Sequence, residues 1–237
     1  MKILVNHLTR MHRGNICVAG VDSKTHRHVR PVVPYQSLPA GLLARHGGPF
    51  DMGRLVDLGS ARARPKPPHV EDHEFGPWDA KSAGEVTAEE FWNLLHLMSE
   101  TDLAEIFGDG FRQVSPGRLG TDPDRGEASL GCLRPEGRPR LYLQRVRDGK
   151  PRIRIEFDDG RLQGDAGVTD LRLFGTDHAT PDEDRVRGVA KWIQDSREVI
   201  LGVGLTRKYR ASDDAPYFHW LQVNNIHLSE DPLWQLA

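Results

Sequence analysis

The sequence has few cysteines and no long apolar run, and each absence argues against a class of protein. The two cysteines, Cys17 and Cys132, form no C-x-x-C pair, which argues against a disulfide scaffold or a cysteine-based zinc site and favours two buried thiols. No stretch approaches the ~20 apolar residues of a membrane-spanning helix. The start, MKILVNHLTRM, lacks the apolar core of a signal peptide. We therefore expect no membrane association and a cytoplasmic location, because free thiols suit a reducing compartment.

The motifs of several enzyme families are also missing. The chain contains no G-x-S-x-G nucleophile turn, no G-x-x-x-x-G-K-[ST] phosphate loop and no G-x-G-x-x-G dinucleotide fingerprint. The sequence therefore predicts no cofactor and favours a binding module over an enzyme.

Glycine and proline are abundant instead. The chain has 24 glycines and 16 prolines among 237 residues, and 38% of its residues are apolar. Many turn residues with few long apolar runs are typical of short strands rather than of a helical bundle. Strands and helices do not alternate, which argues against a Rossmann unit. We predict a mainly β fold with minor α content (α+β), built from two OB-like barrels or half-barrels, the first with a helical insert.

The expected elements fall into two halves, separated by a glycine- and proline-rich stretch at 108–128. Capping boxes at Thr87 to Glu90 and at Thr180 to Glu183 predict helix starts, and a short helix is expected at 102–107. Gly202-x-Gly204 lies inside a strand signal and predicts a bulge or bend. We expect one domain at 1–110, with an acidic helical insert, and another at 111–237. The expected strands are 2–5, 15–21, 28–33, 54–58, 129–133, 140–146, 151–157, 168–174, 198–205 and 217–228.

Charge is segregated along the chain, although the formal net charge is only −2. Residues 1–67 carry a net charge of +8, residues 70–109 of −10 and residues 134–154 of +6. Two basic blocks that lie side by side would form a positive face that attracts polyanions.

One tripeptide occurs twice, each time after an apolar strand. Leu8-Thr9-Arg10 in the first half is repeated as Leu205-Thr206-Arg207 in the second. Equivalent basic loops on two barrels would explain the repeat, and so would chance, because the flanking residues do not match at a fixed period.

Several short motifs follow one another along the chain. They are Asn6-x-x-x-Arg10, the run Cys17-Val-Ala-Gly20, Arg30-Pro31-Val32, Pro68-His-Val-Glu-Asp72 and Val168-Thr-Asp170. Together they resemble the prokaryotic dual OB-fold domain family, except that Asp72 stands where the family pattern has an asparagine. The resemblance implies two OB-like barrels and a nucleic-acid or nucleotide sensor associated with bacterial conflict systems. It transfers no ligand and no catalytic residue to this chain.

Six basic residues are candidates for phosphate binding, because guanidinium and ammonium groups pair with phosphate oxygens. They are Arg10, Arg13, Arg30, Arg207, Lys208 and Arg210. Tyr209 and Trp220 are the candidates for base stacking, which suits single-stranded nucleic acid. In the alternative, Arg30 forms a salt bridge to Asp57 or Glu71, and Trp220 lies in the core. The leading hypothesis is a non-enzymatic module that binds nucleic acid, preferably single-stranded, or a nucleotide.

Two other functions stay open at this point. His69, Glu71, Asp72 and His73 are close in sequence, as in a metal-dependent phosphodiesterase or nuclease. The preceding prolines argue against a helix there, so no metal is predicted, and His69, Glu71 and His73 are the ligand candidates should one bind. In the third hypothesis the chain is an interaction adaptor, and the aromatic residues Phe75 and Trp78 anchor a protein partner.

Overall fold

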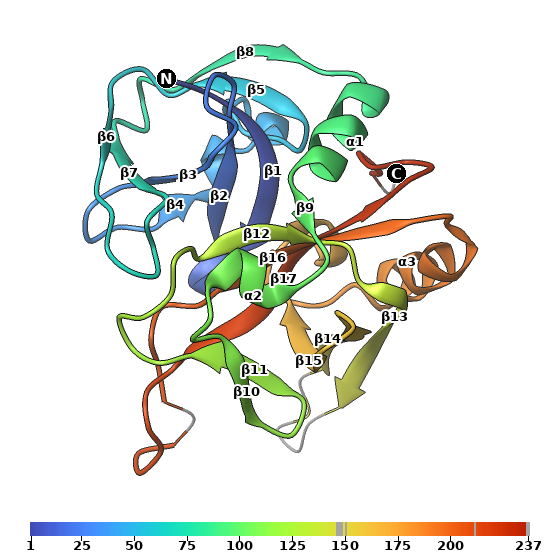
Figure 1. Ribbon diagram of the computed structural model, residues 1–237. Helices are drawn as coiled ribbons and strands as arrows, with labels where there is room; N and C mark the ends of the chain where they lie inside the picture. Colours follow the sequence, from blue (N-terminus) through green and yellow to red (C-terminus); the bar gives the residue numbers. More distant parts are fainter. Residues whose placement is uncertain (146–148, 150, 211, 236–237) are drawn as a thin grey trace.

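The computed structural model describes residues 1–145, 149, 151–210 and 212–235. Two curled sheets, one above the other in Figure 1, form the body of the described structure, and three α-helices pack around them. Strands dominate, and both sheets are curled half-barrels, which confirms the predicted mainly β fold with two OB-like units.

The first sheet is formed by the first part of the chain. Its strands are β1 (Lys2–Arg10), β2 (Asn15–Asp22), β3 (His28–Val32), β4 (Leu38–Pro39), β5 (Arg54–Asp57), β6 (Ala61–Ala63), β7 (Asp72–Phe75) and β8 (Lys81–Glu85). The order across the sheet is β6-β7-β3-β2-β1-β5-β8, with β4 paired to β2. β1 is antiparallel to both β2 and β5, whereas β3 and β7 are parallel. The polar strands β6, β7 and β8 were not expected, because they lack the apolar alternation that marks a strand in a sequence.

The second sheet is formed by the rest of the chain. Its strands are β9 (Ser99–Glu100), β10 (Arg112–Ser115), β11 (Arg118–Thr121), β12 (Leu130–Leu133), β13 (Glu136–Arg145), β14 (Pro151–Asp158), β15 (Gln163–Val168), β16 (Val199–Leu205) and β17 (His219–Leu228). The order is β13-β14-β15-β17-β16-β12-β9, and the β10–β11 hairpin pairs with β17 through β11. Of the strand expected at 140–146, residue 146 lies outside the described residues.

The helices close the two cores. α1 (Ala88–Leu97) begins at the predicted capping box, in which Thr87 and Glu90 bond each other's backbone N–H. It buries Phe91 and Leu95 in the first core. α2 (Leu103–Phe107) buries its apolar residues in the second core, and β9 pairs with β12 of the second sheet. The division of the chain at residue 110 stays a prediction.

Two expectations near α3 (Glu183–Asp195) were wrong. The N-cap is Asp182, which accepts from the Arg185 N–H. Thr180 lies before the helix, where its hydroxyl and N–H both donate to Asp177. The strand expected at 168–174 does not form, because β15 already ends at Val168. A 3₁₀ turn covers Leu171–Leu173 instead, and the Asp170 carboxylate caps it by accepting from the Arg172 N–H.

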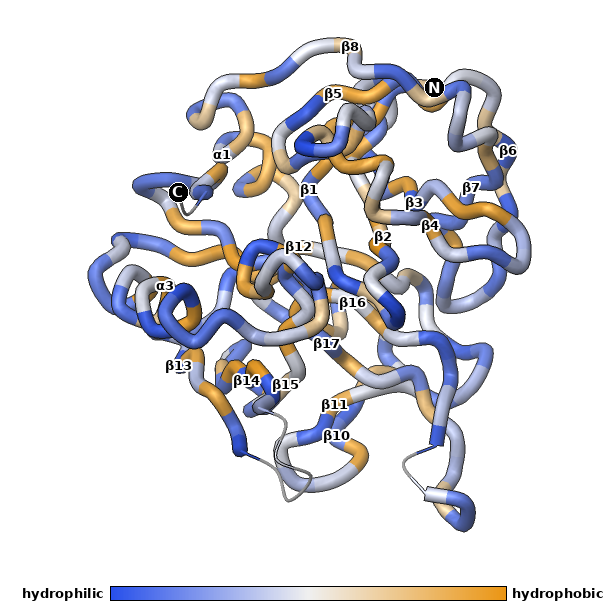
Figure 2. Tube along the Cα trace, turned by 180° about the vertical axis from the view of Figure 1, so that it is seen from behind, coloured by the Kyte–Doolittle hydropathy of each residue, from blue (hydrophilic) through white to orange (hydrophobic). Residues whose placement is uncertain are grey.

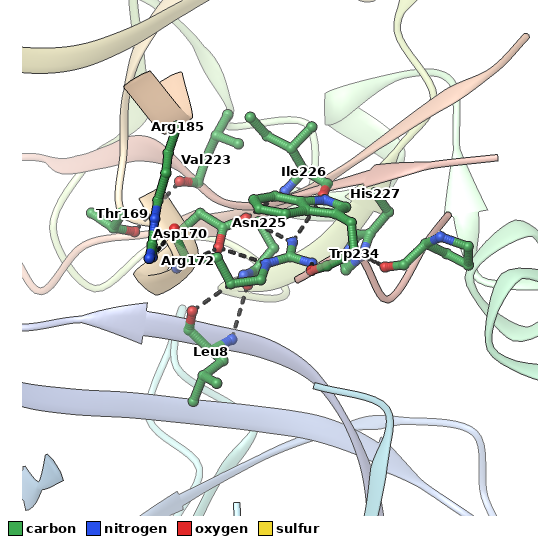
Figure 3. Close-up of polar contacts among 11 residues, drawn as sticks. Leu8, Thr169, Asp170, Arg172, Arg185, Val223, Asn225, Ile226, His227 and Trp234 are labelled. Atoms are coloured by element: carbon green, nitrogen blue, oxygen red, sulfur yellow. Dashed lines mark hydrogen bonds and ion pairs between the residues drawn. The ribbon is translucent and has the colours of Figure 1, made fainter. Parts of the chain in front are cut away.

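Buried polar side chains join the two sheets (Figure 3). The Asn225 side chain on β17 accepts from the Leu8 N–H and donates to the Leu8 carbonyl on β1, at 2.9 and 3.2 Å. Beside it, the Asp170 carboxylate pairs with Arg172 at 2.8 Å and accepts from the Ile226 N–H. The Arg172 guanidinium lies 3.8 Å from the centre of the Trp234 ring. The Asn225 side chain therefore fastens β17 of the second sheet to β1 of the first, and the buried Asp170–Arg172 pair lies beside that contact.

Hydropathy differs between the interior and the surface of the molecule. In Figure 2 the hydrophobic segments lie mainly along interior strands, whereas the outer loops are mainly hydrophilic. Among the described residues no helix has the length and apolar character needed to cross a membrane.

Candidate functional site

A cavity of about 580 Å³ lies between the two sheets. Its wall comes from the ends of β1 and β3, the start of β2, the loop at 33–38, His69 and the region where β16 leads into the loop after it. The wall includes Arg10, Arg30 and Arg207 and, among the described residues, no aspartate or glutamate. This volume falls within the ~300–1,000 Å³ of ordinary small-ligand sites.

The repeated Leu-Thr-Arg tripeptide supplies two sides of this cavity. Thr9 and Arg10 stand at the end of β1, and Thr206 and Arg207 stand just beyond the end of β16. In both places a strand with buried apolar side chains is followed, at its end, by a threonine and an arginine. The repeat therefore brings equivalent residues from the two halves of the chain to one site.

Asp72 holds two of the three arginines from behind the wall. Its Oδ1 lies 2.6 Å from both Nε and Nη2 of Arg30, and its Oδ2 lies 2.6 Å from Nη2 of Arg207. The Arg30 side chain is 8% exposed and that of Arg207 is 59% exposed. One carboxylate is thus shared between two guanidinium groups, which leaves the pair with a net positive charge.

The expected alternative for Arg30, a salt bridge, is therefore present, but its partner is neither of the two expected acids. Asp57 pairs with the chain's terminal amine at 3.5 Å. Glu71 accepts from the Ser129 backbone and hydroxyl and from the Leu130 N–H, between 2.7 and 3.1 Å, and so ties the segment before β7 to β12.

Two groups in the wall have unused hydrogen-bonding capacity. Burial, with the Arg30 and Arg207 guanidinium groups nearby, lowers the pKa of His69 to about 2, so its ring is neutral at physiological pH. Among the described residues neither ring nitrogen of His69 has a hydrogen-bond partner, and the same holds for Nε of Arg10. Buried polar groups normally have partners, so these atoms are available to a bound molecule.

The other three predicted phosphate ligands lie away from the cavity wall. Arg13 is exposed in the 3₁₀ turn after β1, with a φ of 58°. Lys208 pairs with Asp124 at 3.0 Å, and Arg210 pairs with Asp213 at 3.0 Å. The six basic residues therefore do not form one face: Arg10, Arg30 and Arg207 share a cavity, and the others are spread over exposed segments.

The predicted stacking pair is only partly accessible. Tyr209 is half exposed, and its ring centre lies 6.2 Å from that of Trp220. Trp220 is 7% exposed, donates from Nε1 to the Tyr209 carbonyl and has the Arg118 guanidinium 4.0 Å from its ring centre. Both aromatic residues line a second, smaller cavity of about 140 Å³. The core position considered for Trp220 is thus the observed one.

The residues named for the two other hypotheses do not converge. Glu71 and Asp72 are engaged as described, and Nδ1 of His73 lies 2.8 Å from the Glu71 carbonyl. Over the described residues, the one group of three or more potential metal ligands is elsewhere, at His7, His28 and Cys132. Of the expected anchors for a protein partner, Phe75 is buried against Phe50, whereas Trp78 is 84% exposed.

Several wall residues were not predicted. Tyr35, fully exposed with a φ of 61°, stands at the rim, and Gln222 and Asn224 face the cavity from β17. The predicted bulge at Gly202-x-Gly204 is present, and Asn224 is its extra residue on the partner strand. A Cβ atom at Gly204 would lie 2.5 Å from Asn224 Nδ2. The two glycines were therefore the available signal for Asn224.

The family comparison agrees with this architecture. A family model described as a dual OB-containing domain matches residues 1–226. No curated protein and no solved structure gives a significant match.

Proposed function

The chain belongs to the family of dual OB-containing domains, and on that premise we propose that it is a non-enzymatic binding module whose inter-sheet cavity holds the phosphate of a nucleotide. The nucleotide is either free or part of a single strand of nucleic acid. The observation that carries the proposal is the cavity wall itself, in which Arg10, Arg30 and Arg207 face one space and no described wall residue is acidic.

The chemistry of the wall suits a phosphate attached to a polar organic group. The arginines supply charged N–H donors for phosphate oxygens. The neutral ring of His69 and the side-chain amides of Gln222 and Asn224 can pair with the edge of a base or a sugar hydroxyl. Tyr35 at the rim has a free ring face on which a base can stack.

Arg207 is the arginine that can exchange partners most readily. Its side chain is mostly exposed and has one bond to Asp72, whereas Arg30 is buried on the other oxygen of the same carboxylate. A phosphate that enters the cavity would pair with Arg207 while Asp72 keeps its bonds to Arg30. Arg30 would then orient the site, and Arg10 and Arg207 would hold the anion.

The test compares two arginines of one loop. Arg207 lines the cavity and Arg210 does not, yet each pairs with an aspartate. Arg207→Gln should weaken binding about tenfold, because it removes one charge-assisted hydrogen bond. Arg210→Gln, the matched control, should change affinity less than about twofold. Binding is measured by isothermal titration calorimetry with nucleoside mono- and triphosphates, inorganic phosphate and a single-stranded oligonucleotide, at about 50 and 200 mM salt.

The ligand panel identifies the form of the nucleotide. A free nucleotide should bind with a weak dependence on salt, whereas a strand, whose further phosphates also release counterions, should lose affinity steeply as salt rises. Absence of binding by every compound at low salt, or equal losses in Arg207→Gln and Arg210→Gln, would refute the proposal. Participation in a bacterial conflict system stays a prediction, as does a protein partner at Trp78.

A further inference from the structure

A cluster of two histidines and a cysteine lies between the two sheets. His7 is on β1, His28 on β3 and Cys132 on β12, so the cluster draws on both halves of the chain. One potential ligand atom from each residue lies within 4.8 Å of the other two. His7 and Cys132 are buried, and His28 is partly exposed.

Irregular backbone places His7 in this cluster. β1 has a register shift between Val5 and His7, so that Asn6 is an extra residue without a partner on β2. Such bulges redirect side chains and are common beside functional sites. A Cβ atom at Gly202, on β16 of the other sheet, would lie 3.1 Å from the His7 ring, so the glycine there makes room for the imidazole.

Some potential metal-ligand atoms in and beside the cluster have no hydrogen-bond partner among the described residues. Asn6 Nδ2 lies 3.2 Å from Nε2 of His28 and 3.7 Å from Sγ of Cys132, so the amide stands between these two residues. Nδ1 of His7 lies 3.3 Å from Nδ2 of Asn224, within hydrogen-bonding distance. Among the described residues, Nε2 of His7 and Oδ1 of Asn6 are buried and have no hydrogen-bond partner.

We propose that His7, His28 and Cys132 bind one thiophilic d¹⁰ metal ion, Zn²⁺ or Cu⁺, between the sheets. Imidazole nitrogen and thiolate sulfur are preferred ligands of both ions. Binding releases the thiol proton of Cys132 to solvent and forms bonds from its sulfur and the two imidazoles to the metal. These bonds are about 2.0–2.3 Å long for zinc, so the three side chains must move closer together, a change that rotation of the interposed Asn6 amide permits.

The two ions differ in how they fit the site. Cu⁺ with one thiolate and two neutral imidazoles gives a neutral complex, which favours it in a buried position. Zn²⁺ keeps one positive charge and takes a fourth ligand, which Oδ1 of Asn6 can supply once the amide turns. An ion at this position would fasten β1 and β3 of the first sheet to β12 of the second.

The experiment titrates metal-free protein, prepared under reducing anaerobic conditions, in two arms without any nucleotide. In the first arm Co²⁺ replaces Zn²⁺, because a thiolate bonded to cobalt gives a sulfur-to-metal charge-transfer absorption, and added Zn²⁺ should bleach it. In the second arm Cu⁺ is titrated against a chromophoric chelator. We expect one equivalent to bind in at least one arm, and the arm that responds identifies the ion.

Variants locate the bound ion. Cys132→Ser should abolish the charge-transfer absorption, whereas Cys17→Ser, the matched control on the other thiol, should retain it. His28→Gln changes the partly exposed ligand, should leave the fold intact by circular dichroism and should weaken binding at least tenfold. His73→Gln, a partly exposed histidine outside the cluster, should bind as the wild type does.

The inference is overturned if neither arm shows one equivalent of bound ion, or if binding survives both Cys132→Ser and His28→Gln. Should Cys132→Ser fail to fold, His28→Gln alone decides between these outcomes. Because metal is the only added ligand, failure here leaves the proposed nucleotide site untouched, and failure of nucleotide binding leaves the metal site untouched.

Discussion

Charged groups behave differently at the junction of the sheets and in the loop that follows β16. At the junction, Asp170 is fully buried and its partner Arg172 is 10% exposed. In the loop, Arg210 and Asp213 are 40% and 97% exposed. Both are aspartate–arginine pairs with N–O distances near 3 Å, at 2.8 and 3.0 Å. The two pairs differ in desolvation. Burying an ion costs several kcal/mol of hydration free energy, and only the attraction to a well-placed partner offsets that cost. Distance alone therefore does not tell which pair matters.

The largest expected effect comes from breaking the buried pair. Asp170→Asn removes the carboxylate that pairs with Arg172 and caps the 3₁₀ turn, and it leaves a buried guanidinium without its counter-ion. The free energy of unfolding, measured by urea denaturation, should fall by about 3–5 kcal/mol. A loss below about 1 kcal/mol would show that the junction pair is no stronger than a surface pair.

A second difference should appear in the pH dependence of stability. His227 on β17 is fully buried, and burial lowers its pKa to about 4, with Arg172 adding to the effect. In the unfolded chain a histidine titrates near 6.5. Below that pH the unfolded state gains a proton that the folded state cannot accept. The stability that His227 contributes is thus complete above about pH 6.5 and declines, by about 3 kcal/mol in all, as the pH falls toward 4.

Denaturation from pH 7 to pH 4 checks this expectation in matched variants. His227→Gln should unfold with a shallower pH slope than the wild type, whatever its stability at pH 7. His12→Gln, at an exposed position, should keep the wild-type slope. Parallel slopes for His227→Gln and the wild type would contradict the assignment.

The smallest effect is expected from the exposed pair. Asp213→Asn should change the free energy of unfolding by less than about 0.5 kcal/mol, because water and salt screen both charges. The same denaturation assay applies, and added salt should leave the variant and the wild type equally stable. A loss comparable to that of Asp170→Asn would remove the distinction between the two regions.

The sequence predicted the apolar strands well and the polar ones poorly. β1, β2, β14 and β16 alternate or bury continuous apolar runs, which is a strong local signal. β7 was not expected because its residues, Asp-His-Glu-Phe, follow a proline-rich segment and carry no such alternation. Its pairing with β3 is a tertiary event between residues about 40 positions apart, and that pairing places Asp72 opposite Arg30.

The candidate site was likewise predictable only in part, where a local sequence pattern marks its residues. The repeated Leu-Thr-Arg tripeptide marks Arg10 and Arg207, whose convergence on one cavity follows the ends of their strands. Lys208 and Arg210 have the same local character as Arg207, and nothing in the sequence shows that nearby acids, Asp124 and Asp213, hold them outside the cavity. His7, His28 and Cys132 are too far apart in sequence to be recognised as a cluster.

By itself the sequence determined the mainly β class, the capping box of α1, the bulge opposite Gly202 and Gly204, and which residue types could meet an anion. These features depend on neighbours along the chain, through alternation, backbone freedom and short-range hydrogen bonds. Only the tertiary structure decided which arginines face the cavity, that Asp72 serves two of them and that three potential metal ligands meet between the sheets. Those outcomes depend on strand pairing and on sheet-to-sheet packing, which bring together groups that no local pattern relates.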